Sequence, residues 1–278
     1  MRILLTGPTG QVGSALLQTL SKDHDVIPLT RQQLDLSRPQ AVRAPKVDVI
    51  VNAAAYTAVD QAEKEEALAM AVNRDGPAVL AEEAKKTGAL LVHFSTDYVF
   101  DGEKPTAYLE TDAPNPLNAY GRSKLAGEQA IRQCGCRHLI FRTSWVYGVT
   151  GKNFLLTMLR LAREKKPLRV VDDQHGAPTS NLMLAAAVSQ AIGRATTSGT
   201  YHLTAGGKTT WHGFARLIFE ETSTAAELTP IPSKDYVTPA RRPRNSVLDN
   251  AKLQRDFGLR LPSWEQGLRE VLQAWKSA

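Results

Sequence analysis

Short apolar segments alternate with amphipathic segments along the first two-thirds of the chain. Continuous apolar runs are typical of strands buried on both faces of a parallel sheet, whereas apolar residues three and four positions apart indicate helices. We expect strands over Arg2–Thr6, Asp25–Leu29, Asp48–Asn52, Leu90–Phe94 and His138–Arg142, and helices over Gln11–Ser21 and Glu65–Lys86. The repeated strand-helix-strand order predicts an α/β fold with a doubly wound, Rossmann-like parallel sheet.

The regular alternation loosens after the last of these strands. Helices are expected over Phe154–Glu164, Leu182–Arg194 and Trp264–Trp275, and the segment Pro230–Pro243 is rich in turns. We therefore expect residues 1–147 to form mainly the Rossmann domain. Residues 148–278 are expected to form mainly a smaller C-terminal lobe, which binds the substrate and returns some segments to the main sheet.

Composition excludes several classes of protein. The 278 residues are 42% hydrophobic and 22% charged, as in an ordinary globular chain. The apolar start is too short for a signal-peptide core, and no run approaches the roughly 20 apolar residues of a membrane span. We expect a cytoplasmic protein without membrane contact. Cys134 and Cys136, one residue apart, suit neither an unstrained disulfide nor a four-ligand zinc site.

The net charge of +6 is compatible with several kinds of anionic partner. The densest basic cluster is formed by Arg241, Arg242 and Arg244. A nucleic-acid groove needs a longer basic stripe with aromatic residues between the charges. The cluster therefore favours a bound diphosphate, and no nucleic-acid partner is expected.

A glycine-rich turn joins the first strand to the first helix. Gly7, Gly10 and Gly13 follow the spacing GxxGxxG. Gly7 permits a tight turn, Gly10 lets the backbone approach a pyrophosphate, and Gly13 lets helix and strand pack closely. This position makes the motif a dinucleotide-binding turn and residues 1–147 an NAD(P)-binding domain, although a glycine turn without a ligand remains the alternative.

The end of the second strand bears on the choice of cofactor. NAD enzymes typically place a carboxylate there, but this chain has Thr30 followed by Arg31. Arg31 can pair with a 2′-phosphate, which favours NADPH while leaving NADH possible; a solvated loop arginine is the other interpretation. Asp35 lies too far along to restore the acidic contact and is expected near the adenine, and Leu36 beside it is expected among the cofactor-binding residues.

Small side chains end the third strand, at Ala53, Ala54 and Ala55. They would let the ribose and nicotinamide lie flat against the backbone at the carboxyl edge of the sheet. Packing beneath a helix is the alternative interpretation.

Tyr120 and Lys124 lie four residues apart at the start of an expected helix, which places both side chains on one face. A nearby ammonium group stabilises a phenolate and would lower the pKa of Tyr120 toward neutrality. Tyr120 would then donate a proton to a carbonyl oxygen while hydride reaches the carbon. Thr96, at the end of the fourth strand, would give that oxygen a second hydrogen bond.

Motifs along nearly the whole chain are similar to those of the extended short-chain dehydrogenase/reductase family and, within it, of the reductases that act on dTDP-4-dehydrorhamnose. They include GPTGQVG, STDYVFDG, PLNAYGRSKLAGE, FRTSWVYG and DDQHGAPT. The resemblance implies reduction of the 4-keto group of dTDP-4-dehydro-L-rhamnose to dTDP-L-rhamnose, in nucleotide-sugar and cell-surface polysaccharide biosynthesis. It also implies that Tyr120 is the proton donor, Lys124 its activator and ribose clamp, and Thr96 the partner at the carbonyl.

The resemblance implies further contacts. Cofactor contacts are expected at Gly10, Gln11, Val12, Asp35, Ala55, Tyr56 and Thr57. Substrate contacts are expected at Thr96, Asp97 and Trp145, with a core tryptophan as the alternative for Trp145. Gln174 and His175 are expected at the rim of the pocket. Arg241 and Arg242 are our choice for the diphosphate, with a solvated arginine as the alternative for at least one of them.

Two departures from the family pattern have consequences. Some relatives carry an acidic residue at the position of Thr30 and use NADH readily, so both cofactors stay open. Some carry a Glu that helps to bind magnesium across a dimer, where this chain has Ala15. We therefore expect no essential metal, and either a monomer or a homodimer. The remaining alternatives are a reductase of another 4-keto sugar nucleotide, for example one giving 6-deoxy-L-talose, and a non-catalytic NADP-binding regulatory subunit.

Overall fold

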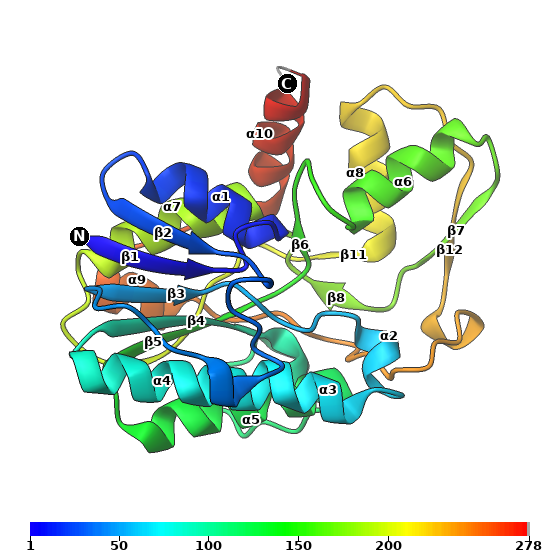
Figure 1. The fold of residues 1–278 in the computed structure, drawn as a ribbon. Coiled ribbons are helices and arrows are strands. Elements are labelled where there is room, and N and C mark those ends of the chain that lie inside the picture. Colours follow the sequence, from blue (N-terminus) through cyan, green and yellow to red (C-terminus); the bar gives the residue numbers. More distant parts are fainter. Residues whose placement is uncertain (277–278) are drawn as a thin grey trace.

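The computed structural model describes residues 1–276 and confirms the α/β fold expected from the sequence. Six parallel strands form the central sheet in the order β10-β5-β4-β3-β1-β2 (Figure 1). They are β1 (Arg2–Thr6), β2 (Asp25–Leu29), β3 (Val49–Asn52), β4 (Leu90–Thr96), β5 (His138–Thr143) and β10 (Gly199–His202). The strand order changes direction between β1 and β3, and such a switch opens a crevice at the carboxyl ends of the strands.

Helices cover both faces of this sheet. On one face α1 (Gln11–Leu20) packs beside α7 (Asn181–Ile192); on the other α4 (Gly76–Thr87) packs beside α5 (Ala119–Cys134) (Figure 1). Successive strand residues point to opposite faces, so β1 contributes alternately to the two apolar cores. Because both faces are covered, the carboxyl edge is where ligands can reach the strands.

The helix expected over residues 65–86 is wrong as a single regular element. It consists of α3 (Glu66–Met70), one π-helical turn at Ala71–Asp75, and α4. Pro77 has no N–H to donate back to the carbonyl of Asn73, and Gly127 of α5 packs against that carbonyl. The helix therefore widens here from α-helical to π-helical geometry for one turn, and such π turns are frequent near functional sites.

The C-terminal half contributes to the sheet and also builds a separate group of elements. β10 pairs with β5, and α9 (Ala251–Phe257) packs on β10. Apart from the sheet in Figure 1 stand α6 (Phe154–Arg163), β7 (Leu168–Val171), α8 (Trp211–Glu221) and β12 (Leu228–Ile231). We call these four elements the lobe. Short strands link it to the sheet: β6 (Val146–Tyr147) pairs with β9 (Thr179–Ser180), and β8 (His175–Gly176) pairs with β11 (Thr209–Thr210).

One part of the segment expected as turns is a strand. β12 runs parallel to β7, with Pro230 opposite Val170. A proline is tolerated because β12 belongs to a two-stranded ribbon and has one neighbour, so its missing N–H breaks no bond on the open side. The helix expected at the C-terminus is confirmed as α10 (Trp264–Lys276).

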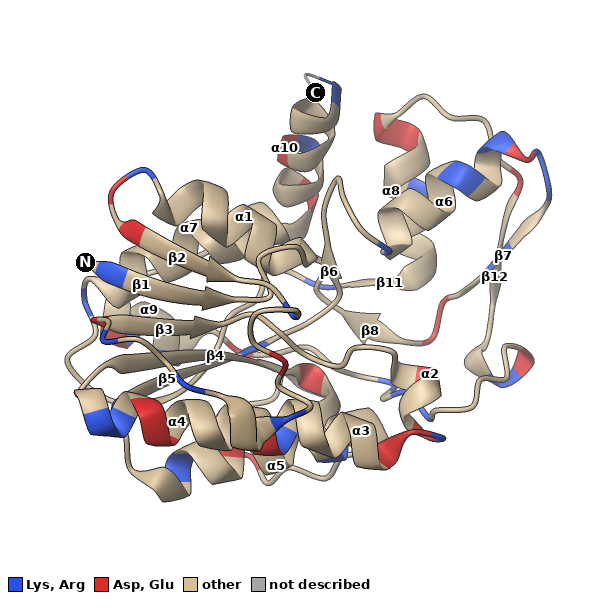
Figure 2. Cartoon of the chain, in the orientation of Figure 1, with Lys and Arg blue, Asp and Glu red and all other residues tan. Residues whose placement is uncertain are grey.

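Figure 2 shows blue and red segments interspersed over the outer helices and loops, while the strands of the central sheet are almost entirely tan. No long basic stripe is visible in this view. Within residues 1–276, no helix is long and apolar enough to cross a membrane.

Candidate active site

A cavity of about 420 Å³ opens at the carboxyl ends of the central strands. We call it the central cavity. It brings together eleven of the residues predicted from the sequence: Gly10, Gln11, Val12, Ala53, Ala55, Thr57, Thr96, Asp97, Tyr120, Lys124 and Trp145. Residues far apart in the sequence meet here because parallel strands end at the same edge of the sheet.

The glycine turn has the shape that a pyrophosphate requires. Gly7 has φ +64°, and a Cβ there would lie 2.9 Å from the Ala54 backbone. A Cβ on Gly13 would lie 2.0 Å from the Gly7 carbonyl oxygen, so only a glycine at position 13 lets the first turn of α1 pack directly against the glycine turn. Gly10 caps α1 without a side-chain hydrogen bond and leaves the first N–H groups of the helix available to an anion. The turn therefore fits a dinucleotide cofactor.

A second cavity, of about 270 Å³, lies between the glycine turn and the end of β2. We call it the β2 cavity. Arg31, Asp35 and Leu36 line it together with Ala54 and Tyr56. The Arg31 side chain is 76% exposed, and its Nε lies 3.6 Å from the Asp35 carboxylate. Hydrogen bonds from Ser37 lower the pKa of Asp35, so a carboxylate and a guanidinium both face this cavity.

Tyr120 enters the central cavity from the first turn of α5. The side chain of Asn118 caps this helix by accepting from the Gly121 N–H at 2.8 Å, and its amide donates to the Arg241 carbonyl. A Cβ on Gly121 would lie 2.2 Å from the Tyr98 carbonyl oxygen, so this glycine lets the helix approach closely. The ring of Tyr98 then meets that of Tyr120 edge-on at 6.0 Å.

The expected lowering of the Tyr120 pKa is not found in this structure. Burial raises the pKa of Tyr120 to about 12; a hydrogen bond with Thr96 opposes this rise and the Asp97 charge adds to it. The Lys124 amine is turned to the Phe94 carbonyl oxygen at 2.6 Å and lies 3.3 Å from Nε2 of His93. Burial also lowers the pKa of Lys124 to about 8, which weakens it as a source of positive charge.

Unpartnered polar atoms mark where a polar ligand fits. Asp97 Oδ2 and Thr143 Oγ1 are buried and have no hydrogen-bond partner within residues 1–276, and both residues line the central cavity. Burial raises the pKa of Asp97 to about 7, and the hydrogen bond from Thr96 to its Oδ1 opposes this rise. Buried polar groups are normally satisfied, so these atoms suit the hydroxyl groups of a sugar.

Two tryptophans stand between the central cavity and the lobe. Trp145 stacks on Trp211, the first residue of α8, with ring centroids 3.6 Å apart. The left-handed backbone of Trp145, at φ +47°, aims its ring there, and a Cβ on Gly176 would lie 2.5 Å from that ring. Trp211, which sequence reasoning did not single out, has no local signal that would place it against Trp145.

A third cavity, of about 340 Å³, lies in the lobe and shares Trp211 with the central cavity. We call it the lobe cavity. Gln174 and Arg242 line it, beside apolar side chains of α6 and β7. The Arg242 guanidinium donates to Thr238 and, at 2.9 Å, to Asp60 of α2 (Val59–Ala62). Burial by itself would raise the pKa of Asp60, but the hydrogen bonds from Arg242 and from the Ala240 N–H, together with the Arg242 charge, lower it.

Other predicted residues lie outside these linings. Within the described part of the chain, His175 and Arg241 are exposed and line none of the three cavities. Their predicted substrate contacts stay predictions, as do all the individual roles assigned above. Several lining residues were missed: Tyr98, Ser144, Lys152, Trp211, Tyr236 and Thr238.

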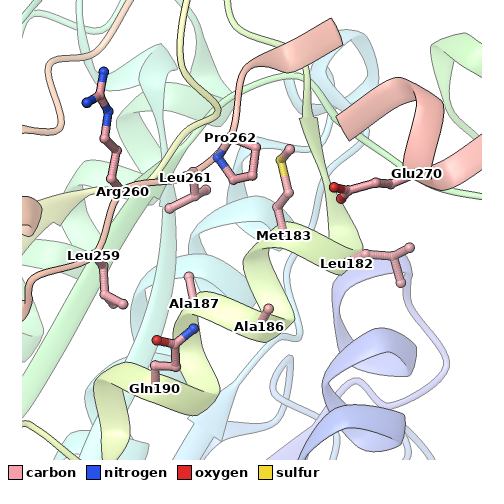
Figure 3. A pocket seen from close by; sticks show the side chains of 10 residues that line it. All are labelled: Leu182, Met183, Ala186, Ala187, Gln190, Leu259, Arg260, Leu261, Pro262 and Glu270. Carbon is pink, nitrogen blue, oxygen red and sulfur yellow. The ribbon is translucent and has the colours of Figure 1, made fainter. Parts of the chain in front are cut away.

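A separate cavity of about 290 Å³ lies between α7 and α10 (Figure 3). Its walls are largely apolar, with Met183 and Leu182 from α7 and Glu270 from α10. No residue predicted for catalysis or binding lines it, so it is not the candidate active site.

Comparisons with known proteins agree with this geometry. The family model described as RmlD substrate binding domain matches residues 1–277. A dTDP-4-dehydrorhamnose reductase of Burkholderia thailandensis is 48% identical over 95% of this chain and 95% of its own length. The corresponding enzyme of Salmonella typhimurium is 47% identical over 98% of this chain and 97% of its own.

Solved structures give the same result. A dTDP-4-dehydrorhamnose reductase of Clostridium acetobutylicum superposes with a TM-score of 0.96 at 39% identity, covering 99% of this chain and 100% of the other. That of Bacillus anthracis, in complex with NADP, gives 0.94 at 37% identity, covering 98% and 99%. The chain belongs to the RmlD family of dTDP-4-dehydrorhamnose reductases.

Proposed function

We propose that this protein is an NADPH-dependent reductase that converts dTDP-4-dehydro-L-rhamnose to dTDP-L-rhamnose. The observation that carries the proposal is the meeting of Thr96, Tyr120 and Lys124 in one cavity with the glycine turn. The activity named for the similar proteins supports the choice of substrate.

Each of the three residues has a role in the reduction. Tyr120 donates its proton to the carbonyl oxygen at C4 of the sugar. Its raised pKa keeps the phenol protonated at neutral pH, so the proton is present when hydride arrives. Thr96 gives the same oxygen a hydrogen bond, which polarises the carbonyl and fixes its angle. Lys124 stabilises the phenolate that forms and holds the cofactor ribose.

The residues present fit NADPH. The glycine turn and the N-terminus of α1 would hold the pyrophosphate, and Asp35, Leu36 and Ala53–Ala55 would flank the adenosine and ribose. Arg31 would pair with the 2′-phosphate. When bound, NADPH supplies the hydride that reaches C4.

The sugar nucleotide is proposed to lie between the Rossmann domain and residues 148–278. Asp97 would accept hydrogen bonds from the sugar, and the Trp145 ring would cover its face. Arg242, and Arg241 from the loop held by Asn118, would bind the diphosphate. The largely apolar lobe cavity, lined by Phe154 and Met158 beside Gln174, suits the base.

The test follows NADPH and NADH absorbance in parallel assays with dTDP-4-dehydro-L-rhamnose made in situ by the upstream dehydratase and epimerase. Epimerase-dependent oxidation, faster with NADPH, and an L-rhamnose product by NMR are expected. A 6-deoxy-L-talose product would move the assignment to a different 4-keto reductase. Cofactor binding without turnover on any 4-keto sugar nucleotide would favour the regulatory-subunit alternative.

Other expectations from the sequence stay predictions. Within residues 1–276, no group of three or more His, Cys, Asp or Glu side chains is placed to hold a metal ion. Independence from metal is tested by turnover in a chelator. The cytoplasmic location and the monomeric or homodimeric state also stay predictions.

A further inference from the structure

A row of buried polar side chains runs across the sheet beneath the central cavity. Thr6, Asn52 and His93 are register partners on β1, β3 and β4, and each is at most 1% exposed. The Thr6 hydroxyl donates to Asn52 Oδ1 at 2.6 Å, and Asn52 Nδ2 lies 3.0 Å from His93 Nδ1. The row ends at Lys124, whose Nζ lies 3.3 Å from His93 Nε2.

The hydrogen bonds of this row determine which nitrogen of His93 carries the proton. Asn52 Oδ1 accepts from the Thr6 hydroxyl and, at 3.2 Å, from the Ala54 N–H. Two donors at this atom turn the amide so that its NH₂ group faces His93 Nδ1. Nδ1 is then an acceptor, and a neutral imidazole carries its proton on Nε2. That N–H points at Lys124 Nζ.

The two charge states of Lys124 interact differently with the His93 N–H donor. An uncharged amine can accept from His93 and still donate to the Phe94 carbonyl oxygen at 2.6 Å. An ammonium group has no lone pair and meets the same N–H as donor against donor. Burial and, second, the Lys124 charge hold the pKa of His93 well below its usual value, so the ring stays neutral.

The other ionisable groups near Lys124 are accounted for by their own contacts. Glu128, one turn further along α5, raises the pKa of Lys124. Its carboxylate is held by Arg142 of β5 at 2.7 and 2.8 Å, by Ser95 and by Arg132. Tyr120 lines the same cavity as Lys124, and the Asp97 charge raises the pKa of Tyr120. Among the described side chains, His93 is the one recorded within hydrogen-bond distance of Nζ.

We propose that His93 is a positioning residue for Lys124: its Nε2–H faces Nζ and donates a hydrogen bond to the uncharged amine that forms when Lys124 gives a proton to Tyr120. This inference rests on the proposed reductase function. Tyr120 gives its proton to the substrate oxygen and becomes a phenolate. The phenolate takes a proton from the Lys124 ammonium group, which leaves the amine hydrogen-bonded to His93. A proton from solvent in the cavity then restores the ammonium group.

The first test compares two amides at position 93. In His93→Gln the side-chain NH₂ reaches the place of Nε2, whereas in His93→Asn the amide reaches only the place of Nδ1. We expect kcat to fall about 10-fold or more in His93→Asn with KM nearly unchanged, and to recover to within about 3-fold of wild type in His93→Gln. Equal kcat in the two variants and wild type would overturn the proposal.

A matched control comes from the adjacent strand. His138 is a buried histidine at the amino end of β5, away from the cavity, and its Nδ1 contacts the Cys136 carbonyl. His138→Gln removes a buried imidazole without touching the row. We expect its kcat and its pH profile to match wild type.

The second test reads the histidine directly and needs no turnover. Long-range ¹H–¹⁵N spectra of histidine-labelled protein distinguish the two neutral tautomers, and His93→Gln assigns the signal. We expect the Nε2–H tautomer in wild type and Nδ1–H in Asn52→Asp, where the new carboxylate attracts the Nδ1 proton. An Nδ1–H tautomer in wild type would overturn the proposal. Because this measurement is made on the wild-type protein, it still decides the question if a variant with a buried substitution does not fold.

The same Asn52→Asp variant links the tautomer to the reaction. With Nε2 as an acceptor, the Lys124 ammonium group gains a hydrogen bond, and the basic limb of kcat should move up by about half a pH unit or more. An unmoved limb would count against the proposal. A wild-type protein with the Nε2–H tautomer and no reductase activity would instead contradict the proposed function.

Discussion

The indole rings of Trp145 and Trp211 stack face to face, with centroids 3.6 Å apart and planes within 8° of parallel. Trp145 follows β5 of the sheet, and Trp211 begins α8 of the lobe. The stack therefore joins the two parts of the molecule at the point where the central cavity and the lobe cavity meet.

Removing one ring of this stack should weaken substrate binding more than chemistry. Trp211→Ala frees Trp145 to move and removes an aromatic pair worth about 0.5–1.5 kcal/mol besides its buried area. We expect KM for the sugar nucleotide to rise about 10-fold with kcat within about 3-fold. Steady-state kinetics check this, with Trp211→Phe retaining most of the affinity.

The control for that variant is Trp275→Ala on α10, which removes a partly buried indole remote from the cavities. Its KM should equal that of wild type. A wild-type KM in Trp211→Ala would show that the stack does not serve substrate binding.

Gly176→Ala should disturb the same stack by crowding the Trp145 ring. The added methyl group would lie 2.5 Å from the Trp145 ring, which must move or be strained. We expect a rise in KM and a loss of about 1–3 kcal/mol in the free energy of unfolding, as for other overpacked sites. Gly193→Ala is the matched control, because its nearest neighbour lies 3.9 Å away. Equal denaturation midpoints in the two variants would contradict the expected clash.

Arg31→Ala should change cofactor preference. A hydrogen bond to a charged group contributes about 1.5–3 kcal/mol, and the exposure of Arg31 to solvent favours the lower end. We expect KM for NADPH to rise about 10-fold while KM for NADH stays unchanged. Arg43→Ala removes an arginine outside the β2 cavity and should alter neither value. An equal rise for both cofactors would remove Arg31 from 2′-phosphate recognition.

The reduction rate should fall as pH rises through about 8. Burial lowers the pKa of Lys124 from 10.5 to about 8, so the ammonium group is present below that pH and is lost above it. The phenolate that forms on Tyr120 needs this positive charge. A profile of kcat against pH checks the sign and position of the basic limb. A rate that stays constant through this range would show that the charge of Lys124 is not needed.

Much of the fold was predictable because strand and helix patterns are local. The five strands expected in the first two-thirds of the chain are present, and the glycine turn lies where its spacing placed it. The interruption in the helix before β4 was not predictable, because it depends on Gly127 of a later helix packing against the Asn73 carbonyl.

The candidate site, like the fold, was predictable where it depends on local sequence and not where it depends on contacts between distant segments. The meeting of Thr96, Tyr120 and Lys124 in the central cavity was predictable because each lies in or beside a local motif at the end of a strand or the start of a helix, and their roles stay predictions. Trp211 and the partnership of Asp60 with Arg242 were not predictable, because each depends on a contact between segments far apart in the sequence. The charge state of Tyr120 was also beyond the sequence, since burial and the partners of Lys124 decide it.

The central claim is that Tyr120 donates the proton in an NADPH-dependent reduction of dTDP-4-dehydro-L-rhamnose. The most direct test is NADPH absorbance in a single turnover of wild type and Tyr120→Phe, with Tyr108→Phe as the control for loss of a tyrosine hydroxyl away from the cavity. We predict a rate lower by roughly 10²–10⁴ in Tyr120→Phe, the usual contribution of general acid catalysis, with NADPH affinity retained and Tyr108→Phe unchanged. An undiminished rate in Tyr120→Phe would contradict the account.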